Sequence, residues 1–430
     1  MLTQLLSFKV KDVDVNETKI EEFKNRLTGQ LIRPGDAAYD EARRVWNGLI
    51  DKYPALIARV ANEADVIEAV NFARQHNLLL SVRGGGHNAA GHATNDGGIV
   101  IDLSFMKGIQ VDPQVRTVRA QGGVTWGELD QETQKFGLAT PGGVVSTTGI
   151  AGLTLGGGIG WLRRKHGLSS DNLLSVDVVT ADGRFLKASE TENADLFWAI
   201  RGSGGNFGVV TSFEYRLHPV GPEVMVLVVM YPAEKALEVL PVWRNFMAAA
   251  PDAFSSNAYF WTIPAAPILP PEVHGKRIIG FTGLYAGPVD EGERLVQPLR
   301  ELAAPVLDLS GVTPYTTVQS QVDAFFPAGL YHYWKSLYLN QLDDETINTL
   351  ANWAIERPSE HTMIDIWAMG GVSSRIPAEA TTLGEQSAPF WRAMGGTEDW
   401  VAANETAFGH RNSPFWLVFN TSWTDPQDTD

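Results

Sequence analysis

The sequence predicts an α+β fold in two domains, residues 1–222 and residues 223–430. The chain has 430 residues, 44% of them hydrophobic, which is enough for two cores of ordinary domain size. Helix-like and strand-like segments are mixed along the chain. After HPVGPE at 218–223 the glycine loops give way to longer alternating strands, so we place the domain boundary there.

The first domain opens with a mixture of helices and short strands. Over residues 19–80 the segments IEEFKNRLTG, YPALIARVAN, ADVIEAVNFARQHN and LLLSV predict the order helix, strand, helix, strand. From 97 to 222, short apolar runs alternate with glycine loops, and residues 125–137 and 193–202 have the pattern of helices. This part of the chain is therefore expected to be an α+β domain rich in glycine loops.

The second domain is expected to be one antiparallel sheet covered by helices. Its strand candidates are VMVLVVMY, NAYFWTI, RIIGFTGLYAG, HTMIDIWAMGG and FWLVFNTSW. Amphipathic segments such as AEKALEVLPVWRNFMAAA separate the strands, and residues 265–276 form a proline loop. The chain contains no internal repeat that would indicate a repeat fold.

Composition excludes several classes of function. The chain carries 34 Lys and Arg against 50 Asp and Glu, a formal net charge of -16, which opposes binding to nucleic acid or to anionic membranes. Because there is no cysteine, there is no disulfide, no thiolate nucleophile and no cysteine-ligated metal, and we expect no metal site. The N-terminal segment lacks the apolar core of a secretion signal and no apolar run is long enough to span a bilayer, so we expect a cytoplasmic protein.

Three glycine-rich loops in the first domain predict a nucleotide site. They are RGGGHN at 83–88, PGGVVSTTGIAGLTLGGGIG at 141–160 and RGSGGNFG at 201–208. Glycine lets the backbone approach a ligand and turn its N–H groups towards an anion, so three such loops suggest a bound pyrophosphate. A dinucleotide site of the Rossmann type is disfavoured, because the third loop follows a helix and precedes a strand, the reverse of the required order.

The loops and their flanking segments resemble a known family. RGGGHN, GHATNDGGIVIDLS, TTGIAGLTLGGGIGWL, LSSDNLLSVDVVTADG and ENADLFWAIRGSGGNFGVVTSFEYRLHPV follow one another as in the FAD domain of the vanillyl-alcohol oxidase and p-cresol methylhydroxylase superfamily. Within it, the chain is similar to the berberine-bridge-enzyme-like oxidoreductases. YWKS at 333–336, GG at 370–371 and GHR at 409–411 extend the similarity into the second domain. The resemblance implies FAD as cofactor, oxidoreductase activity and an antiparallel substrate domain that roofs the flavin.

His87 is the residue that the resemblance singles out. In such proteins the histidine of the RGGGHN loop is bonded to the 8α-carbon of FAD, and a neutral imidazole is nucleophilic near pH 7. The alternative is that His87 caps its loop by hydrogen bonding. Relatives that hold the flavin twice use a cysteine where this chain has Val145, so attachment through His87 only is implied. The other residues that the resemblance places around FAD are Arg83, Gly84, Gly85, Gly86, Asn88, Val145, Thr147, Thr148, Gly149, Gly152, Gly156, Gly158, Gly208 and Val209.

The first group of candidates for the substrate side lies in HTMIDIWAMGG. A strand period of two puts His361, Met363, Asp365 and Trp367 on one face. By analogy with the family, Asp365 is expected to face the pocket as a catalytic group and Trp367 as a substrate-binding one. Either could instead be an ordinary strand or core residue.

The second group comes from YHYWKS and GHRN. Tyr333 and Lys335 alternate onto one face of their strand, where the lysine could stabilise a neighbouring phenolate, so both are catalytic candidates. His410 is a further catalytic candidate. The alternatives are a core aromatic for Tyr333, a structural ion pair for Lys335 and a loop histidine for His410.

We therefore expect a covalent FAD oxidoreductase that oxidises a C–H bond next to an alcohol or amine by hydride transfer to flavin N5, with O2 as acceptor. Its partner is a small-molecule substrate such as a sugar, an aromatic alcohol or a cyclic amine. A dehydrogenase with another acceptor is an open alternative. So is a truncated or non-catalytic flavin-binding protein, because family members continue past WTDPQDTD with a substrate-facing segment and a run resembling YDPxNxFRxNxNI.

Overall fold

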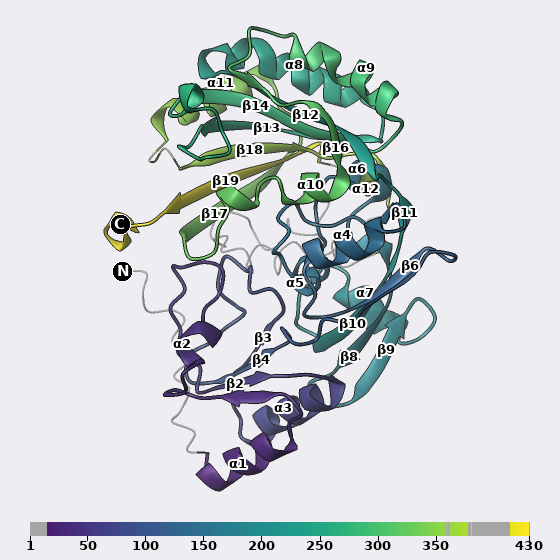
Figure 1. Ribbon diagram of the computed structural model, residues 1–430, viewed down its shortest axis with the longest axis vertical. Helices are drawn as coiled ribbons and strands as arrows, with labels where there is room; N and C mark the ends of the chain where they lie inside the picture. Colours follow the sequence, from purple (N-terminus) through teal and green to yellow (C-terminus); the bar gives the residue numbers. More distant parts are fainter. Residues whose placement is uncertain (1–14, 358, 360, 377–379, 381–412, 430) are drawn as a thin grey trace.

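The fold is α+β, as predicted, and is built around three large sheets (Figure 1). The computed structural model describes residues 15–357, 359, 361–376, 380 and 413–429. Two of the sheets occupy the lower half of Figure 1, and the third sheet occupies the upper half together with its helices. The glycine loops lie where the two halves meet.

The first sheet leads into the first glycine loop. Its elements are α1 (Glu17–Arg26), β1 (Gln30–Ile32), α2 (Tyr39–Ala42), β2 (Leu56–Arg59), α3 (Glu63–Gln75), β3 (Leu80–Arg83) and β4 (Ile99–Asp102). The strand order is β1-β2-β4-β3, with β2 and β3 parallel to β4. Asn62 caps α3 by accepting a hydrogen bond from the Asp65 N–H group at 3.0 Å, and Phe23 of α1 stacks on Phe72 of α3. The four predicted segments are α1, β2, α3 and β3, and the sequence analysis missed β1 and α2 between the first two.

The second sheet is antiparallel, and the two other glycine loops flank it. Its elements and connections are β5 (Ile109–Asp112), β6 (Thr117–Gln121), α4 (Trp126–Gln134), β7 (Leu138–Ala139), α5 (Ile150–Leu155), α6 (Arg163–His166), β8 (Leu173–Val179), β9 (Phe185–Ser189), α7 (Ala194–Ile200), β10 (Val209–Arg216) and β11 (His218–Pro219). The strand order is β5-β6-β10-β8-β9. Helix α4 begins with a capping box in which Glu128 accepts a hydrogen bond from the Thr125 N–H group. Helices α4 and α7 are the two that the sequence predicts here.

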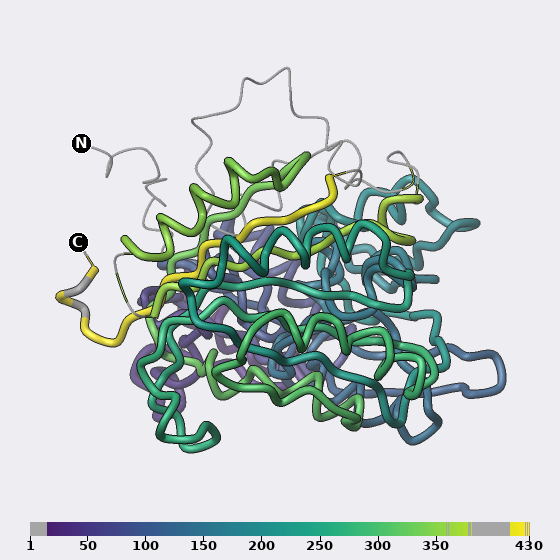
Figure 2. Tube along the Cα trace, turned by 90° about the horizontal axis from the view of Figure 1, so that it is seen from above, coloured from purple at the N-terminus to yellow at the C-terminus, as the bar shows by residue number. Residues whose placement is uncertain are grey.

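The third sheet is the antiparallel sheet expected for the second half of the chain. Its elements are β12 (Glu223–Pro232), α8 (Ala236–Ala249), β13 (Phe254–Thr262), β14 (Arg277–Tyr285), α9 (Val289–Arg300), β15 (Leu307–Asp308), β16 (Gly311–Pro314), α10 (Tyr315–Ser320), β17 (Tyr331–Leu339), α11 (Asp344–Glu356), β18 (Met363–Ala368), α12 (Val372–Arg375) and β19 (Phe415–Trp423). The strand order is β15-β12-β14-β13-β18-β19-β17, with β16 also paired to β12. Helices α8, α9 and α11 lie side by side over the outer face and bury a core that includes Trp243 and Phe281 (Figure 2). The boundary at 222/223 stays a prediction.

Two arginines of α6 tie the second glycine loop to the third sheet. Arg163 and Arg164 are both buried, and they donate hydrogen bonds of 2.5–3.0 Å to main-chain carbonyl groups. The acceptors are Gly160, Ser256 and Ala368 for Arg163, and Ala250, Phe254 and Met369 for Arg164. Most of these acceptors lie more than 80 residues away in the chain, so the guanidinium groups fix the loop against the sheet.

A second buried contact joins α4 to α10. Gln319 donates from Nε2 to Asp130 Oδ2 at 2.9 Å and to the Gly143 carbonyl at 3.1 Å. Asp130 is 1% exposed, and Tyr315 is buried close to it. A carboxyl group therefore sits in the interface between the two halves of the molecule.

Within the described residues, none of the helices has the length and apolar character that crossing a membrane requires.

Replacing Asp130 with asparagine is expected to stabilise the protein at alkaline pH. Burial raises the pKa of Asp130 to about 7, against the hydrogen bond from Gln319, which lowers it. The folded state therefore holds the proton more tightly than the unfolded state, and stability falls as pH rises from the ordinary aspartate range to about 7. Since one pKa unit corresponds to roughly 1.4 kcal/mol, the variant should exceed the wild type in unfolding free energy by about 2–4 kcal/mol at pH 8 and match it near pH 4. Urea unfolding at both pH values measures this, and equal stabilities at pH 8 would contradict it.

Candidate active site

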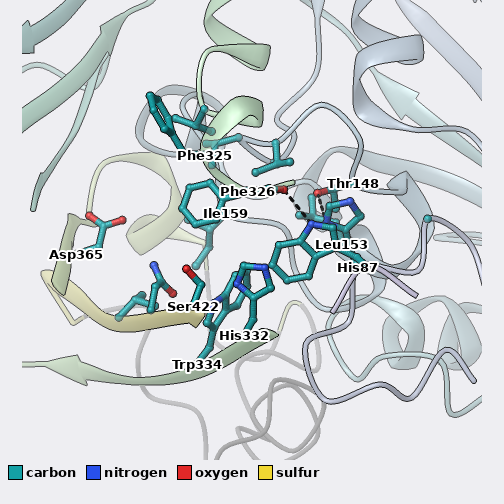
Figure 3. A pocket seen from close by; sticks show the side chains of 18 of the residues that line it. His87, Thr148, Leu153, Ile159, Phe325, Phe326, His332, Trp334, Asp365 and Ser422 are labelled. Carbon is teal, nitrogen blue, oxygen red and sulfur yellow. Dashed lines mark hydrogen bonds between the residues drawn. The ribbon is translucent and has the colours of Figure 1, made fainter. Parts of the chain in front are cut away.

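A cavity of about 1680 Å³ lies between the glycine loops and the inner face of the third sheet (Figure 3). Sites for single small molecules are typically about 300–1000 Å³, so this cavity has room for a dinucleotide together with a small substrate. Most of the residues that the resemblance places around FAD line it. They are Gly84, Gly85, Gly86, His87, Asn88, Val145, Thr148, Gly149, Gly152, Gly156, Gly158 and Gly208.

Glycine is required where the first two loops approach each other. A Cβ atom on Gly85 would lie 2.3 Å from the main-chain nitrogen of Gly149, and a Cβ atom on Gly149 would lie equally close to that of Gly85. Gly152 and Gly205 differ, because a Cβ atom there would meet no atom within 4 Å, and both line the cavity. A side chain at either position would fill the cavity, so the loops form a cradle that main-chain groups line closely. This cradle fits the nucleotide part of FAD.

His87 lies in the cavity wall with both ring nitrogens near threonine hydroxyls of the second loop (Figure 3). Nε2 is 2.9 Å from Thr147 Oγ1, and Nδ1 is 3.4 Å from Thr148 Oγ1. One face of the ring stacks on Trp46 at a centroid distance of 5.1 Å. Burial, with a smaller contribution from His332, lowers the pKa of His87 to about 4. The imidazole is therefore neutral at pH 7 and keeps a lone pair for a nucleophilic or hydrogen-bonding role.

Three of the expected cofactor residues, Arg83, Thr147 and Val209, do not line the cavity, so their contacts with FAD stay predictions. The Arg83 guanidinium faces away from the cavity and pairs with the buried carboxylate of Asp102 at 2.6 Å. Val209 does not line the cavity, because its side chain packs into the core beneath the first sheet. Thr147 also lies outside the cavity wall, and it meets the site only through its hydroxyl contact with His87.

Known proteins share this fold and these loops. The family model described as an FAD binding domain matches residues 54–189. An FAD-linked oxidoreductase of Dictyostelium discoideum is 33% identical over 362 residues, which cover 84% of this chain and 76% of that protein. The chain belongs to the FAD-linked oxidoreductases. The oxidoreductase is an FAD-dependent enzyme, as the loops predict.

Two further similarities extend the comparison. The oxidoreductase is 37% identical over 292 residues to (R)-6-hydroxynicotine oxidase of Paenarthrobacter nicotinovorans, and these residues cover 68% of this chain and 62% of that protein. The crystal structure of 6-hydroxy-D-nicotine oxidase from Arthrobacter nicotinovorans matches with a TM-score of 0.76 and 27% identity, covering 93% of this chain and 82% of that one. BBE-like 1 of Physcomitrella patens shares the fold, with a TM-score of 0.76. The vanillyl-alcohol-oxidase-type fold is thereby confirmed.

Opposite the loops, β18 brings Asp365 to the cavity wall of the oxidoreductase (Figure 3). Its carboxylate accepts hydrogen bonds from Asn257 Nδ2 at 2.7 Å and from Trp367 Nε1 at 2.6 Å. Burial raises the pKa of Asp365 to about 7, although both hydrogen bonds and the charge of Arg163 lower it. The carboxyl group can therefore exchange a proton near neutral pH.

The predicted phase of β18 is correct. Met363, Asp365 and Trp367 all line the cavity, together with His361 just before the strand. Trp367 stacks on Trp161 at a centroid distance of 5.6 Å. The guanidinium of Arg163 also lies 4.8 Å from the centroid of the Trp367 ring. Trp367 is thus held by both contacts, and its indole N–H group donates to Asp365.

The predicted phase of β17 is wrong. His332 and Trp334 line the cavity, whereas Tyr333 and Lys335 do not (Figure 3). Tyr333 is 49% exposed, and the Lys335 ammonium lies 5.4 Å from the centroid of its ring. YHYWKS has an aromatic residue in both alternating sets, so the period of two gives the two faces without telling which one turns inward. Tyr333 and Lys335 are therefore not groups of this cavity.

The remaining catalytic candidate, His410, lies outside the described residues, so its role stays a prediction.

The sequence analysis missed three residues of the site that lie far from the motifs. Trp46 contacts His87, Asn257 contacts Asp365, and His332 stacks on Trp46, yet none of the three belongs to a recognisable pattern. Their nearest signal is that Trp46 precedes the first glycine loop in a segment without helix or strand periodicity.

Proposed function

We propose that this oxidoreductase holds FAD covalently through His87 only and oxidises a C–H bond next to an alcohol or amine of a small molecule. The observation that carries the proposal is a neutral imidazole and a proton-exchanging carboxyl group on opposite walls of one cavity, His87 on the loops and Asp365 on the sheet. Attachment at a second residue through sulfur would need a cysteine, and the chain has none.

In this proposal the loops hold the cofactor and the residues of the third sheet act on the substrate. When bound, FAD supplies a hydride acceptor at N5. The glycine cradle holds the nucleotide through main-chain groups, and His87 fixes the ring end of the cofactor. Asp365 accepts the proton of the substrate O–H or N–H group, while Asn257 and Trp367 orient its carboxylate.

Replacing His87 with alanine is expected to abolish covalent attachment. After acid denaturation, the wild-type pellet should be yellow and fluorescent on a denaturing gel, and the pellet of His87→Ala should be colourless with its flavin in the supernatant. A matched His92→Ala variant, changed at the second histidine of the same segment, should keep the yellow pellet. A colourless wild-type pellet would refute covalent attachment, and a yellow pellet from His87→Ala would place the bond elsewhere.

The substrate and the electron acceptor belong to the proposal as well. Similar proteins are named as oxidases of 6-hydroxynicotine and of chitooligosaccharides, so the panel should contain cyclic amines, sugars and aromatic alcohols. Bleaching of the bound flavin under anaerobic conditions would identify a substrate, and recovery of the colour with O2 would identify an oxidase. Recovery only with an artificial dye would indicate a dehydrogenase, and no bleaching by any compound would favour a non-catalytic flavin protein. The cytoplasmic location stays a prediction for cell fractionation.

A further inference from the structure

Trp46, Asn47 and Gly48 form a joint between the first glycine loop and the segment that begins β17. On the loop side, the Trp46 N–H group donates to the Gly86 carbonyl at 3.1 Å, and Asn47 Nδ2 donates to the Ala89 carbonyl at 2.8 Å. Both acceptors directly flank His87 and Asn88 in the chain. The joint therefore holds the main chain around the attachment histidine.

On the other side, the same three residues pair with residues 329–332. Asn47 donates from Nδ2 to the His332 carbonyl at 3.0 Å and accepts from the His332 N–H group through Oδ1 at 3.0 Å. Two main-chain hydrogen bonds of 2.8–2.9 Å continue the pairing, from Gly48 to Leu330 and from Gly329 to Trp46. Asn47 is fully buried, and a Cβ atom on Gly48 would lie 2.2 Å from the Gly329 carbonyl oxygen. The contact is therefore close and specific.

The side chains continue the joint as a stack of three rings. Trp46 lies between His87, at a centroid distance of 5.1 Å, and His332, at 3.9 Å, with interplanar angles of 19° and 13°. Trp46 also donates from Nε1 to the Phe326 carbonyl at 3.0 Å (Figure 3). Trp46 is 5% exposed and His332 is 2% exposed, so both rings are shielded from solvent.

We propose that Trp46 is a positioning residue for flavin attachment: it fixes the plane of the His87 imidazole by stacking, and residues 326–332 fix Trp46 in turn. The inference rests on the proposed attachment through His87. It means that the segment leading into β17, more than 200 residues from the glycine loop, sets the angle at which the imidazole meets the cofactor. His87 alone is insufficient for rapid attachment.

The attachment reaction makes this orientation important. It replaces one C–H bond of the flavin 8-methyl group and one imidazole N–H bond with a C–N bond. The two electrons and two protons that are released are accepted by O2, which becomes H2O2. The new bond forms along the nitrogen lone pair in the ring plane, so a tilted imidazole presents the lone pair in the wrong direction.

The test compares attachment rates in four proteins. Apoprotein from riboflavin-depleted cells is mixed with FAD in air, and acid-precipitable flavin is followed over time for the wild type, Trp46→Leu, Trp46→Phe and Trp353→Leu. Trp353 is an exposed tryptophan of α11, so its replacement controls for the loss of an indole. Because a misplacement of about 1 Å can cost roughly 10²-fold in rate, we expect Trp46→Leu to attach flavin on the order of 10²-fold more slowly. Trp46→Phe should recover most of the rate, and Trp353→Leu should match the wild type.

The outcomes separate this inference from the proposed function. If the wild type attaches no flavin, the covalent proposal fails and this inference fails with it. If the wild type and Trp46→Leu attach flavin at equal rates, or if Trp46→Phe is as slow as Trp46→Leu, only the positioning role is overturned. Should Trp46→Leu fail to fold or to quench FAD fluorescence, the pair His332→Leu and His332→Phe decides, because it removes or keeps the ring that supports Trp46. Slow attachment in His332→Leu with recovery in His332→Phe supports the inference, and equal rates refute it.

Discussion

Replacing Asp365 with asparagine should lower kcat by about two to four orders of magnitude, the range that a positioned general base contributes. Asparagine has nearly the same shape but cannot accept the proton that leaves the substrate O–H or N–H group. Asp365 is buried in the cavity wall and is oriented by Asn257 and Trp367, so no neighbouring carboxylate replaces it among the described lining residues. Steady-state oxidation of the substrate found by flavin bleaching measures the effect.

The pH profile supplies a sharper readout of the same group. Since burial raises the pKa of Asp365 to about 7, the charged, proton-accepting form grows as pH rises through that value. Activity of the wild type should therefore increase roughly tenfold per pH unit below pH 7 and level off above it, and this limb should vanish in Asp365→Asn. Asp344→Asn, which changes an exposed aspartate of α11, should behave as the wild type. An unchanged kcat in Asp365→Asn would show that another group is the base.

Replacing Gly85 with alanine is expected to cost about 3 kcal/mol or more of unfolding free energy and to abolish FAD binding. The added Cβ atom would lie 2.3 Å from the nitrogen and 2.7 Å from the Cα atom of Gly149. Both are main-chain atoms, so no side-chain rotation relieves the clash, and the first two glycine loops must separate.

Two matched variants separate this clash from other effects of an added methyl group. Gly311→Ala places a Cβ atom in open space in β16, and its stability should stay within about 0.5 kcal/mol of the wild type. Gly152→Ala adds a methyl group that meets no protein atom but enters the cavity, so it should weaken FAD binding with little loss of stability. Equal behaviour of Gly85→Ala and Gly311→Ala in urea unfolding would contradict the close approach of the loops.

Much of the fold could be predicted because its signals are local. The helices α3, α4 and α7 follow from apolar periodicity, and the glycine loops are apparent from composition alone. Alternation also places Asp365 and Trp367 on one face of β18, and the family resemblance indicated that this face turns inward. Such signals arise within a few residues, where chain geometry determines side-chain direction.

The features that could not be predicted from the sequence depend on contacts between segments that are distant in the chain. The phase of β17 is set by its pairing with β19, and the YHYWKS pattern is compatible with either face. Arg83 is the first residue of the RGGGHN loop, but its position at the end of β3 directs its side chain to Asp102. Trp46 meets His332 across 286 positions of sequence, and its own segment has no periodicity that would announce a site. No local pattern can encode these pairings.

The buried arginines of α6 bear on how ligands reach the cavity. Withdrawing Arg163 and Arg164 from the third sheet would break six buried hydrogen bonds at once. Separating α6 from the third sheet at each turnover would therefore cost free energy. We therefore expect substrate and product to enter and leave the cavity while α6 stays bound to the third sheet.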